Sequence, residues 1–123
     1  RIISRKKEIA QEYRKHLGGL PSVILPSNMD WADSVYWLYT VLIDDDLPGL
    51  CVEKLMQALK QQGIDSRPIF PPMHKQPIYE TGLVLPICES ISRRGISLPS
   101  APDIHDDDIA DICDVIKREI KSR

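Results

Sequence analysis

Apolar side chains recur three and four residues apart in three stretches of the chain, and this spacing predicts three helices that each bury one face. A shorter helix of one or two turns is predicted from Pro86 up to Gly95. The three longer helices are expected over residues 2–17, from the N-cap Asp46 to Gly63, and from a start near Asp103 or His105 towards the end of the chain.

Other segments are short and rich in β-branched and aromatic side chains, which predicts strands. Residues 35–43 contain neither glycine nor proline and are expected to form a central strand that is covered on both faces. Residues 66–70 predict an edge strand, because Pro68 cannot donate to a ladder, and residues 95–99 predict a third strand. Residues 20–33 are expected to form a loop. The order of elements predicts an α/β (α+β) domain, with helices packed on a three-stranded sheet.

Composition narrows the class of protein. The chain of 123 residues is 42% hydrophobic and 28% charged, which is typical of one soluble globular domain. Its formal net charge of −2 gives no basic field for nucleic acid. The basic face of the 2–17 helix is expected to be solvated. No apolar run approaches the roughly 18 residues of a membrane helix, and no secretory leader is visible. We therefore expect a cytoplasmic protein without a nucleic-acid or membrane partner.

Two groups of residues resemble sites but have simpler explanations. The cysteines are odd in number and far apart, so neither a disulfide framework nor a zinc site is indicated. We expect all three to be reduced and mostly buried. His105 and the aspartates that follow it suit the start of a helix, so we expect no metal there. The residues are Cys51, Cys88 and Cys113, and Asp106, Asp107 and Asp108.

The strongest candidate for a binding segment is the loop that follows the 66–70 strand. Prolines at 68, 71, 72 and 77 stiffen it, so it loses less entropy when it becomes ordered. Its side chains are of binding type: a fixed cation, an imidazole and two rings. Three alternatives to a binding role stay open. Tyr79 could simply pack within the loop, Arg67 could form an ion pair with a nearby carboxylate, and the whole loop could be a connector. The candidate substrate-binding residues are Arg67, Phe70, Met73, His74 and Tyr79, together with Arg94 beyond the loop.

A complete active site is not visible in the sequence. None of the common nucleophile, metalloprotease, P-loop or dinucleotide motifs is present. Among the three histidines only His74 lies beside other polar loop residues. A small hydrolase built on His74 with Cys88 or an aspartate is one alternative. A non-catalytic small-molecule-binding or regulatory α/β module, with the proline loop as its recognition edge, is another.

Two motifs carry a resemblance to a known family. They are Ser66-Arg67-Pro68-x-Phe70-x-Pro72-Met73-His74-x-Gln76-Pro77-x-Tyr79 and Ile91-Ser92-Arg93-Arg94-Gly95-Ile96-Ser97-Leu98-Pro99-Ser100. The chain thereby resembles the C-terminal part of the DegT/DnrJ/EryC1/StrS family of fold-type-I, pyridoxal-phosphate-dependent sugar aminotransferases. Within that family it is most similar to the perosamine-synthetase branch.

The resemblance implies a specific organisation of the chain. Residues 1–19 would be the end of an interdomain helix, whose apolar stripe should be partly uncovered, and residues 20–123 the small C-terminal domain with a mainly antiparallel sheet. The family's large domain would lie outside this chain. In the parent enzyme that domain supplies the groups that hold pyridoxal phosphate, so we expect no cofactor, no catalytic residue and no activity in this chain alone.

The resemblance also implies the partners of the parent enzyme. They would be a nucleotide-sugar substrate, glutamate as amino donor and a second copy in a homodimer. The small domain would close over the substrate side of the active site.

Overall fold

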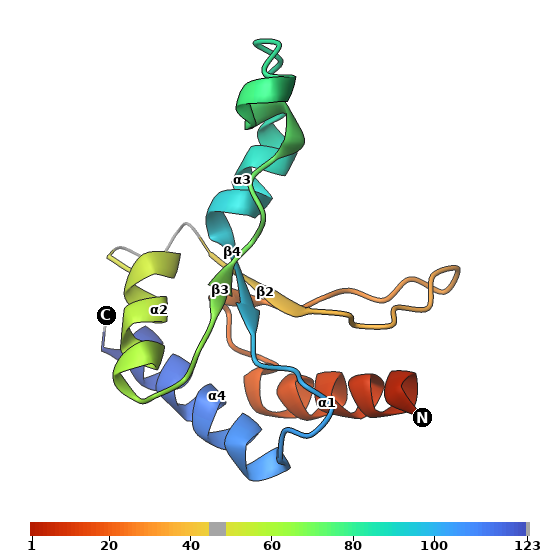
Figure 1. Ribbon diagram of the computed structural model, residues 1–123. Helices are drawn as coiled ribbons and strands as arrows, with labels where there is room; N and C mark the ends of the chain where they lie inside the picture. Colours follow the sequence, from red (N-terminus) through yellow and green to blue (C-terminus); the bar gives the residue numbers. More distant parts are fainter. Residues whose placement is uncertain (45–48, 123) are drawn as a thin grey trace.

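An antiparallel sheet lies at the centre of the fold (Figure 1). The computed structural model describes residues 1–44 and 49–122. Four strands follow one another across the sheet in the order β1-β2-β4-β3, and every neighbouring pair is antiparallel. The predicted class and the antiparallel sheet are confirmed. The strands are β1 (Val23–Ile24), β2 (Tyr39–Ile43), β3 (Arg67–Pro68) and β4 (Gly95–Leu98).

The sheet differs from the prediction at two places. β1 forms inside the segment expected to be a loop, and it extends the sheet because Val23 pairs with Ile43 at the end of β2. β2 begins at Tyr39, whereas the sequence predicted a strand from residue 35. The preceding Val35 and Trp37 are exposed, so the prediction of a strand covered on both faces was wrong for these residues. Pro68 lies in the edge strand, as predicted.

Three helices pack together against one face of the sheet. They are α1 (Ile2–Leu17), α2 (Val52–Gln61) and α4 (Asp106–Lys121). Their buried side chains form a single core with every second residue of β2, namely Tyr39, Val41 and Ile43. At about 25 cal/mol per Å² of buried apolar surface, this shared core is the main stabilising feature of the domain.

The helix boundaries follow the sequence patterns closely, with one exception. α2 begins at Val52 with Cys51 at the N-cap position, and the predicted N-cap Asp46 lies outside the described residues. α4 follows His105, whose backbone N–H donates to Asp108 Oδ2 at 3.2 Å. This bond satisfies one of the free donors of the helix start.

Among the described residues no group of histidine, cysteine and carboxylate side chains is arranged to hold a metal ion.

The apolar stripe of α1 is covered along only part of its length. Ile9 and Tyr13 are buried, whereas Ile2 and Ile3 in the first turn are exposed. A partly uncovered stripe was expected from the resemblance, but the interdomain role of residues 1–19 stays a prediction.

None of the helices in the described part of the chain is both long and apolar enough to cross a membrane.

The cysteine prediction needs a correction. All three thiols are free, but only Cys113 is buried, while Cys51 and Cys88 are exposed. Cys113 belongs to the buried stripe of α4. The other two lie at the start of α2 and within a helix that stands away from the core, where the local apolar pattern does not lead to burial.

Two segments project from the core (Figure 1). The first, here called the arm, comprises residues 69–94 and rises above the sheet between β3 and β4. It contains the short helices η1 (Met73–Lys75) and η2 (Pro77–Tyr79) and the helix α3 (Pro86–Arg94). The second, the 26–38 loop, runs out and back beside α1 and leads into β2. These two segments carry most of the large exposed apolar side chains.

Candidate functional site

An open groove runs beside the edge of the sheet, between the two projecting segments. Its volume is about 2080 Å³, and its lining comes from Lys6 of α1, the end of the 26–38 loop, three of the strands, the base of the arm and α4. The end of the 26–38 loop supplies Trp37, the base of the arm supplies Phe70, and β3 supplies Arg67. Thr40 of β2 and Ser97 of β4 also line the groove, and their hydroxyl oxygens lie 2.9 Å apart in a hydrogen bond.

Arg67 is one of several cations that line this groove; the others are Lys6 of α1 and Lys117, Arg118 and Lys121 of α4. The Arg67 side chain is 80% exposed, and its only ion pair given by the described residues is with Asp65, at 3.5 Å between Nη2 and Oδ2. That distance is at the limit of a hydrogen bond, and a contact between two exposed groups contributes little. The ion-pair alternative for Arg67 is therefore present but weak, and the guanidinium keeps donors for a ligand.

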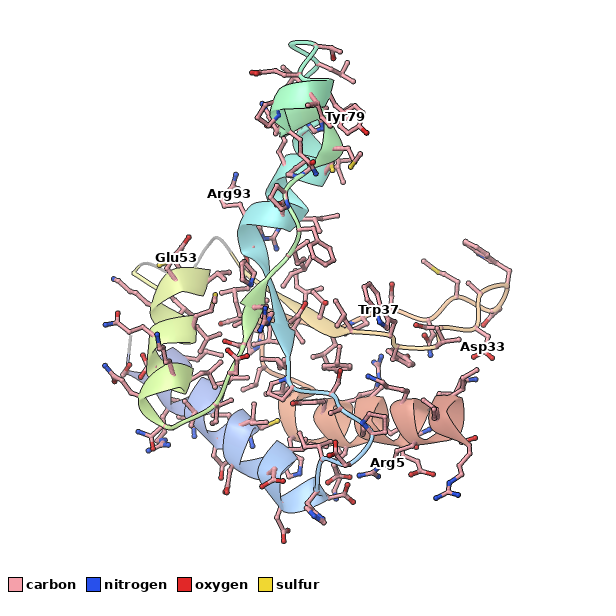
Figure 2. All side chains as sticks on the ribbon, in the orientation of Figure 1. Arg5, Asp33, Trp37, Glu53, Tyr79 and Arg93 are labelled. Atoms are coloured by element: carbon pink, nitrogen blue, oxygen red, sulfur yellow. The ribbon has the colours of Figure 1, made fainter. Side chains whose placement is uncertain are left out.

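Phe70 lies at the junction of two surfaces. It lines the main groove, and it also lines a smaller, almost wholly apolar groove along α3 with Leu85, Ile87 and Ile91. The residue is 67% exposed. Met73 and Tyr79 lie further out on the arm, are exposed by 60% and 50%, and do not line the main groove. Figure 2 shows Tyr79 well out along the arm, away from the sheet.

His74 faces the inside of the arm. It is buried, and its Nε2 lies 2.9 Å from Glu89 Oε1. Glu89 also accepts a hydrogen bond from the backbone N–H of Leu85 at 3.1 Å and lies 3.4 Å from Lys75 Nζ. The hydrogen bond from His74, followed by that from Leu85, lowers the pKa of Glu89 to about 2. The arm has two limbs: the outgoing residues 69–85, which include η1 and η2, and the returning helix α3. These contacts join the two limbs.

Arg94 lies at the base of the arm, where α3 meets β4. Its Nε donates to the backbone carbonyl of Ile43 at 2.9 Å. Arg94 does not line the main groove. Its position therefore suits fixing the arm to the end of β2.

The structure thus brings together only two of the six predicted site residues, Arg67 and Phe70. It adds Trp37, Thr40 and Ser97, which the sequence placed in core strands. One signal for Trp37 was available: Asp33 and Ser34, just before it, are typical of turns rather than of a buried strand.

Comparison with known proteins adds independent findings. The model of the DegT/DnrJ/EryC1/StrS aminotransferase family matches residues 1–117. The chain is 38% identical over 120 residues to a GDP-perosamine synthase of Vibrio cholerae, a match that covers 95% of this chain and 32% of the relative. A GDP-perosamine synthase of Escherichia coli O157:H7 is 35% identical, over 94% of this chain and 30% of the relative. The chain thus spans about a third of the length of these curated relatives.

Solved structures share the fold. The structure of DesI with its TDP-sugar product matches with a TM-score of 0.84 and 28% identity, over 96% of this chain and 31% of that one. Helicobacter pylori PseC, an aminotransferase of pseudoaminic acid biosynthesis, matches with a TM-score of 0.85. Its 18% identity shows similarity of fold alone; the coverage is 98% of this chain and 33% of PseC.

Proposed function

Because this chain belongs to the DegT/DnrJ/EryC1/StrS aminotransferase family, we propose that it is the small C-terminal domain of a pyridoxal-phosphate-dependent nucleotide-sugar aminotransferase. The parent enzyme would transfer an amino group from glutamate to a keto sugar, and formation of perosamine at C4 is the narrower proposal. The observation that carries it is the 38% identity to a GDP-perosamine synthase over 95% of the chain. We further propose that the parent acts as a cytoplasmic homodimer.

The described residues do not fit pyridoxal phosphate by themselves. The cofactor requires a Schiff-base lysine, a carboxylate at the pyridine nitrogen and a cup for the phosphate. Burial lowers the pKa of Lys6, but its Nζ donates to the carbonyls of Trp37 and Ser100. Lys75 stands beside Glu89 on the arm. We therefore assign the cofactor's site to regions of the parent that correspond to the other two-thirds of its relatives.

The contribution of this domain would be one wall of the substrate site. The exposed guanidinium of Arg67 suits the phosphates of a nucleotide sugar, because its fork can bind two oxygens at once. Phe70 at the base of the arm, and Met73 and Tyr79 further out along it, offer exposed apolar faces. His74 and Arg94 already have partners inside the domain, and we propose that they act by holding the arm in place.

The proposal is tested in a parent enzyme that carries this chain. Amino transfer from glutamate to a GDP-linked 4-keto-6-deoxymannose is measured, and we expect turnover with that sugar. Arg67→Ala should raise KM for the nucleotide sugar at least several-fold, whereas Arg93→Ala, which alters an exposed arginine outside the groove, should not. A parent that binds the cofactor but does not aminate any keto sugar would overturn the proposal. An unchanged KM would remove only Arg67 from the site.

A second function is favoured by the groove itself. An exposed indole, a phenyl ring, several hydroxyls and charged side chains of both signs line one concave surface, and this is the chemistry of a small-molecule site. A non-catalytic binding module would bind its ligand saturably as this chain alone. The aminotransferase proposal expects little or no binding by the chain alone, so titration with nucleoside diphosphates and nucleotide sugars separates the two functions.

A further inference from the structure

The polar face of α1 is bonded to other parts of the fold, and three of its cations reach the 26–38 loop. The sequence predicted a solvated basic face, and the structure corrects this. Arg14 Nη2 donates to the carbonyl of Pro26 at 2.6 Å. Lys7 Nζ lies 2.7 Å from both carboxylate oxygens of Asp33.

The third cation is Lys6. Its Nζ donates to the carbonyl of Trp37 at 3.0 Å, and it also donates to Ser100 in the segment that follows β4. Figure 2 shows Asp33 and Trp37 on the loop where it runs beside α1. The contacts from α1 therefore reach the loop near its start, beside its tip and at its end.

The loop has few other attachments. Within the described residues, the remaining hydrogen bonds of the loop are internal: Ala32 N–H donates to the Met29 carbonyl, Tyr36 N–H to Ser34 Oγ, and Tyr36 Oη to Asn28 Oδ1. Beyond these, the Tyr36 ring is partly buried and lies 6.2 Å from the ring of Tyr39. The loop also exposes Met29, Trp31, Val35 and Trp37 to solvent. Such a segment has little stability of its own, so a few charged contacts decide its position.

We propose that Lys6, Lys7 and Arg14 form a latch that holds the 26–38 loop against α1 and thereby positions Trp37 on the wall of the groove. Residues 34–38 line that groove together with Arg67. Release of the latch lets the loop move away from α1, which changes the shape of the groove while the core of α1, α4 and the sheet stays folded. This inference goes beyond the proposed function and does not depend on it.

Hydrogen exchange of the whole chain tests the latch. The reporters are the amides of Ala32 and Tyr36, because their hydrogen bonds lie inside the loop. Lys7→Met keeps an apolar stem and removes the charge. We expect it to accelerate exchange at the reporters on the order of three- to fivefold, the range of an exposed ion pair. Asp33→Asn should have the same effect from the loop side, and the double variant should add nothing further.

The matched control is Lys15→Met, because Lys15 is also on α1 but its ion pair is with Glu12 of the same helix. It should leave the reporters unchanged. About 1 M salt should reproduce the acceleration in the unmodified chain and have little further effect in Lys7→Met. Lys6→Met should also accelerate the reporters; should this variant fail to fold, Asp33→Asn still decides the question.

Tryptophan fluorescence gives a second readout. The sequence contains two tryptophans, Trp31 and Trp37, so fluorescence anisotropy reports on the loop alone. We expect the fast component of the anisotropy decay, which reports local motion of the loop, to be larger in Lys7→Met and in Asp33→Asn. It should be unchanged in Lys15→Met. Unchanged exchange and anisotropy in both latch variants would overturn the proposal. Acceleration that is equally large in β4 and α4 would also overturn it, because it would show general destabilisation.

Discussion

His74 Nε2 lies 2.9 Å from Glu89 Oε1, and this contact joins η1 to the start of α3. The two residues are fifteen positions apart in the sequence and belong to opposite limbs of the arm. Glu89 also accepts a hydrogen bond from the backbone N–H of Leu85. One carboxylate therefore binds both the imidazole and a backbone donor at the start of α3. The arm therefore has a polar centre of its own, separate from the apolar core under the sheet.

This arrangement predicts an acid-sensitive arm. The pKa of Glu89 is lowered from its ordinary 4.5 to about 2, chiefly by the bond from His74. A depressed pKa in the folded state stabilises the fold at pH values above the unfolded pKa. That contribution is lost as the pH falls from about 4.5 to about 2. Hydrogen exchange at α3 should therefore accelerate in this window, before the amides of α4 respond.

Glu89→Gln should remove this pH dependence and loosen the arm at neutral pH. Glu80→Gln, which alters an exposed carboxylate at the tip of the arm, is the control and should behave as the unmodified chain does. Equal acid sensitivity in Glu89→Gln and in the unmodified chain would contradict the prediction.

The stacked rings of Tyr13 and Tyr39 provide a matched pair of substitutions. Their centroids are 4.5 Å apart with an interplanar angle of 10°. Tyr13 Oη donates to the carbonyl of Pro99 at 2.7 Å, whereas Tyr39 Oη is buried and has no hydrogen-bond partner among the described residues.

Tyr13→Phe should lower the free energy of unfolding by about 1 kcal/mol, because it leaves the Pro99 carbonyl unpaired. Tyr39→Phe should leave the free energy of unfolding unchanged or raise it by up to about 1 kcal/mol, because it removes an unsatisfied hydroxyl. Urea unfolding of both variants checks the difference. A larger loss in Tyr39→Phe than in Tyr13→Phe would show that the Tyr39 hydroxyl has a partner in solution.

Gly95 marks the tight junction between the arm and β4. A Cβ at this position would lie 1.7 Å from Ile69 Cδ1 and 3.0 Å from the carbonyl oxygen of Ile91. Gly95→Ala should therefore destabilise the fold by about 1–3 kcal/mol through overpacking. The Ile69 side chain causes the closest clash, so the double variant Gly95→Ala with Ile69→Ala should recover part of the loss in a urea-unfolding cycle. Strictly additive losses would place the strain elsewhere.

The sequence predicted those parts of the fold in which a local pattern decides burial. The stripe of α4, with Ile109, Ile112 and Ile116, is buried as its spacing indicated. The pattern failed where burial depends on distant segments. Tyr36 and Trp37 have strand propensity, but none of the strands in the described part of the chain pairs with them. The two-residue strand β1 is too short to show any pattern.

The candidate site was predicted in part for the same reason. Arg67 and Phe70 lie on the groove because the edge strand and the proline loop were located correctly. His74 had the chemistry of a ligand-binding residue, and its sequence neighbours gave no sign that Glu89 faces it from the other limb. The bonds from Lys6 and Lys7 to the loop were equally invisible, because they depend on how α1 lies beside residues 26–38.

The three thiols should differ sharply in reactivity. Cys51 and Cys88 are exposed, whereas Cys113 is fully buried in the stripe of α4, and burial raises the pKa of its thiol to about 12. The thiolate is the reactive form, so Cys113 is protected both by inaccessibility and by its protonation. We expect an aromatic disulfide reagent to label two thiols of the folded chain at pH 8 and the third only after unfolding.

The Cys51→Ser and Cys88→Ser variants should each lose one of the two thiols that the reagent labels quickly in the folded chain. Cys113→Ala should keep both of these and lose only the third thiol, which is labelled slowly. The slow labelling of Cys113 then measures opening of the core, because the reagent reaches this thiol only when α4 separates from α1 and α2. Denaturants that loosen the core should therefore raise the logarithm of this labelling rate in proportion to the decrease in the free energy of unfolding. Labelling of all three thiols at one rate in the native chain would contradict the burial of α4.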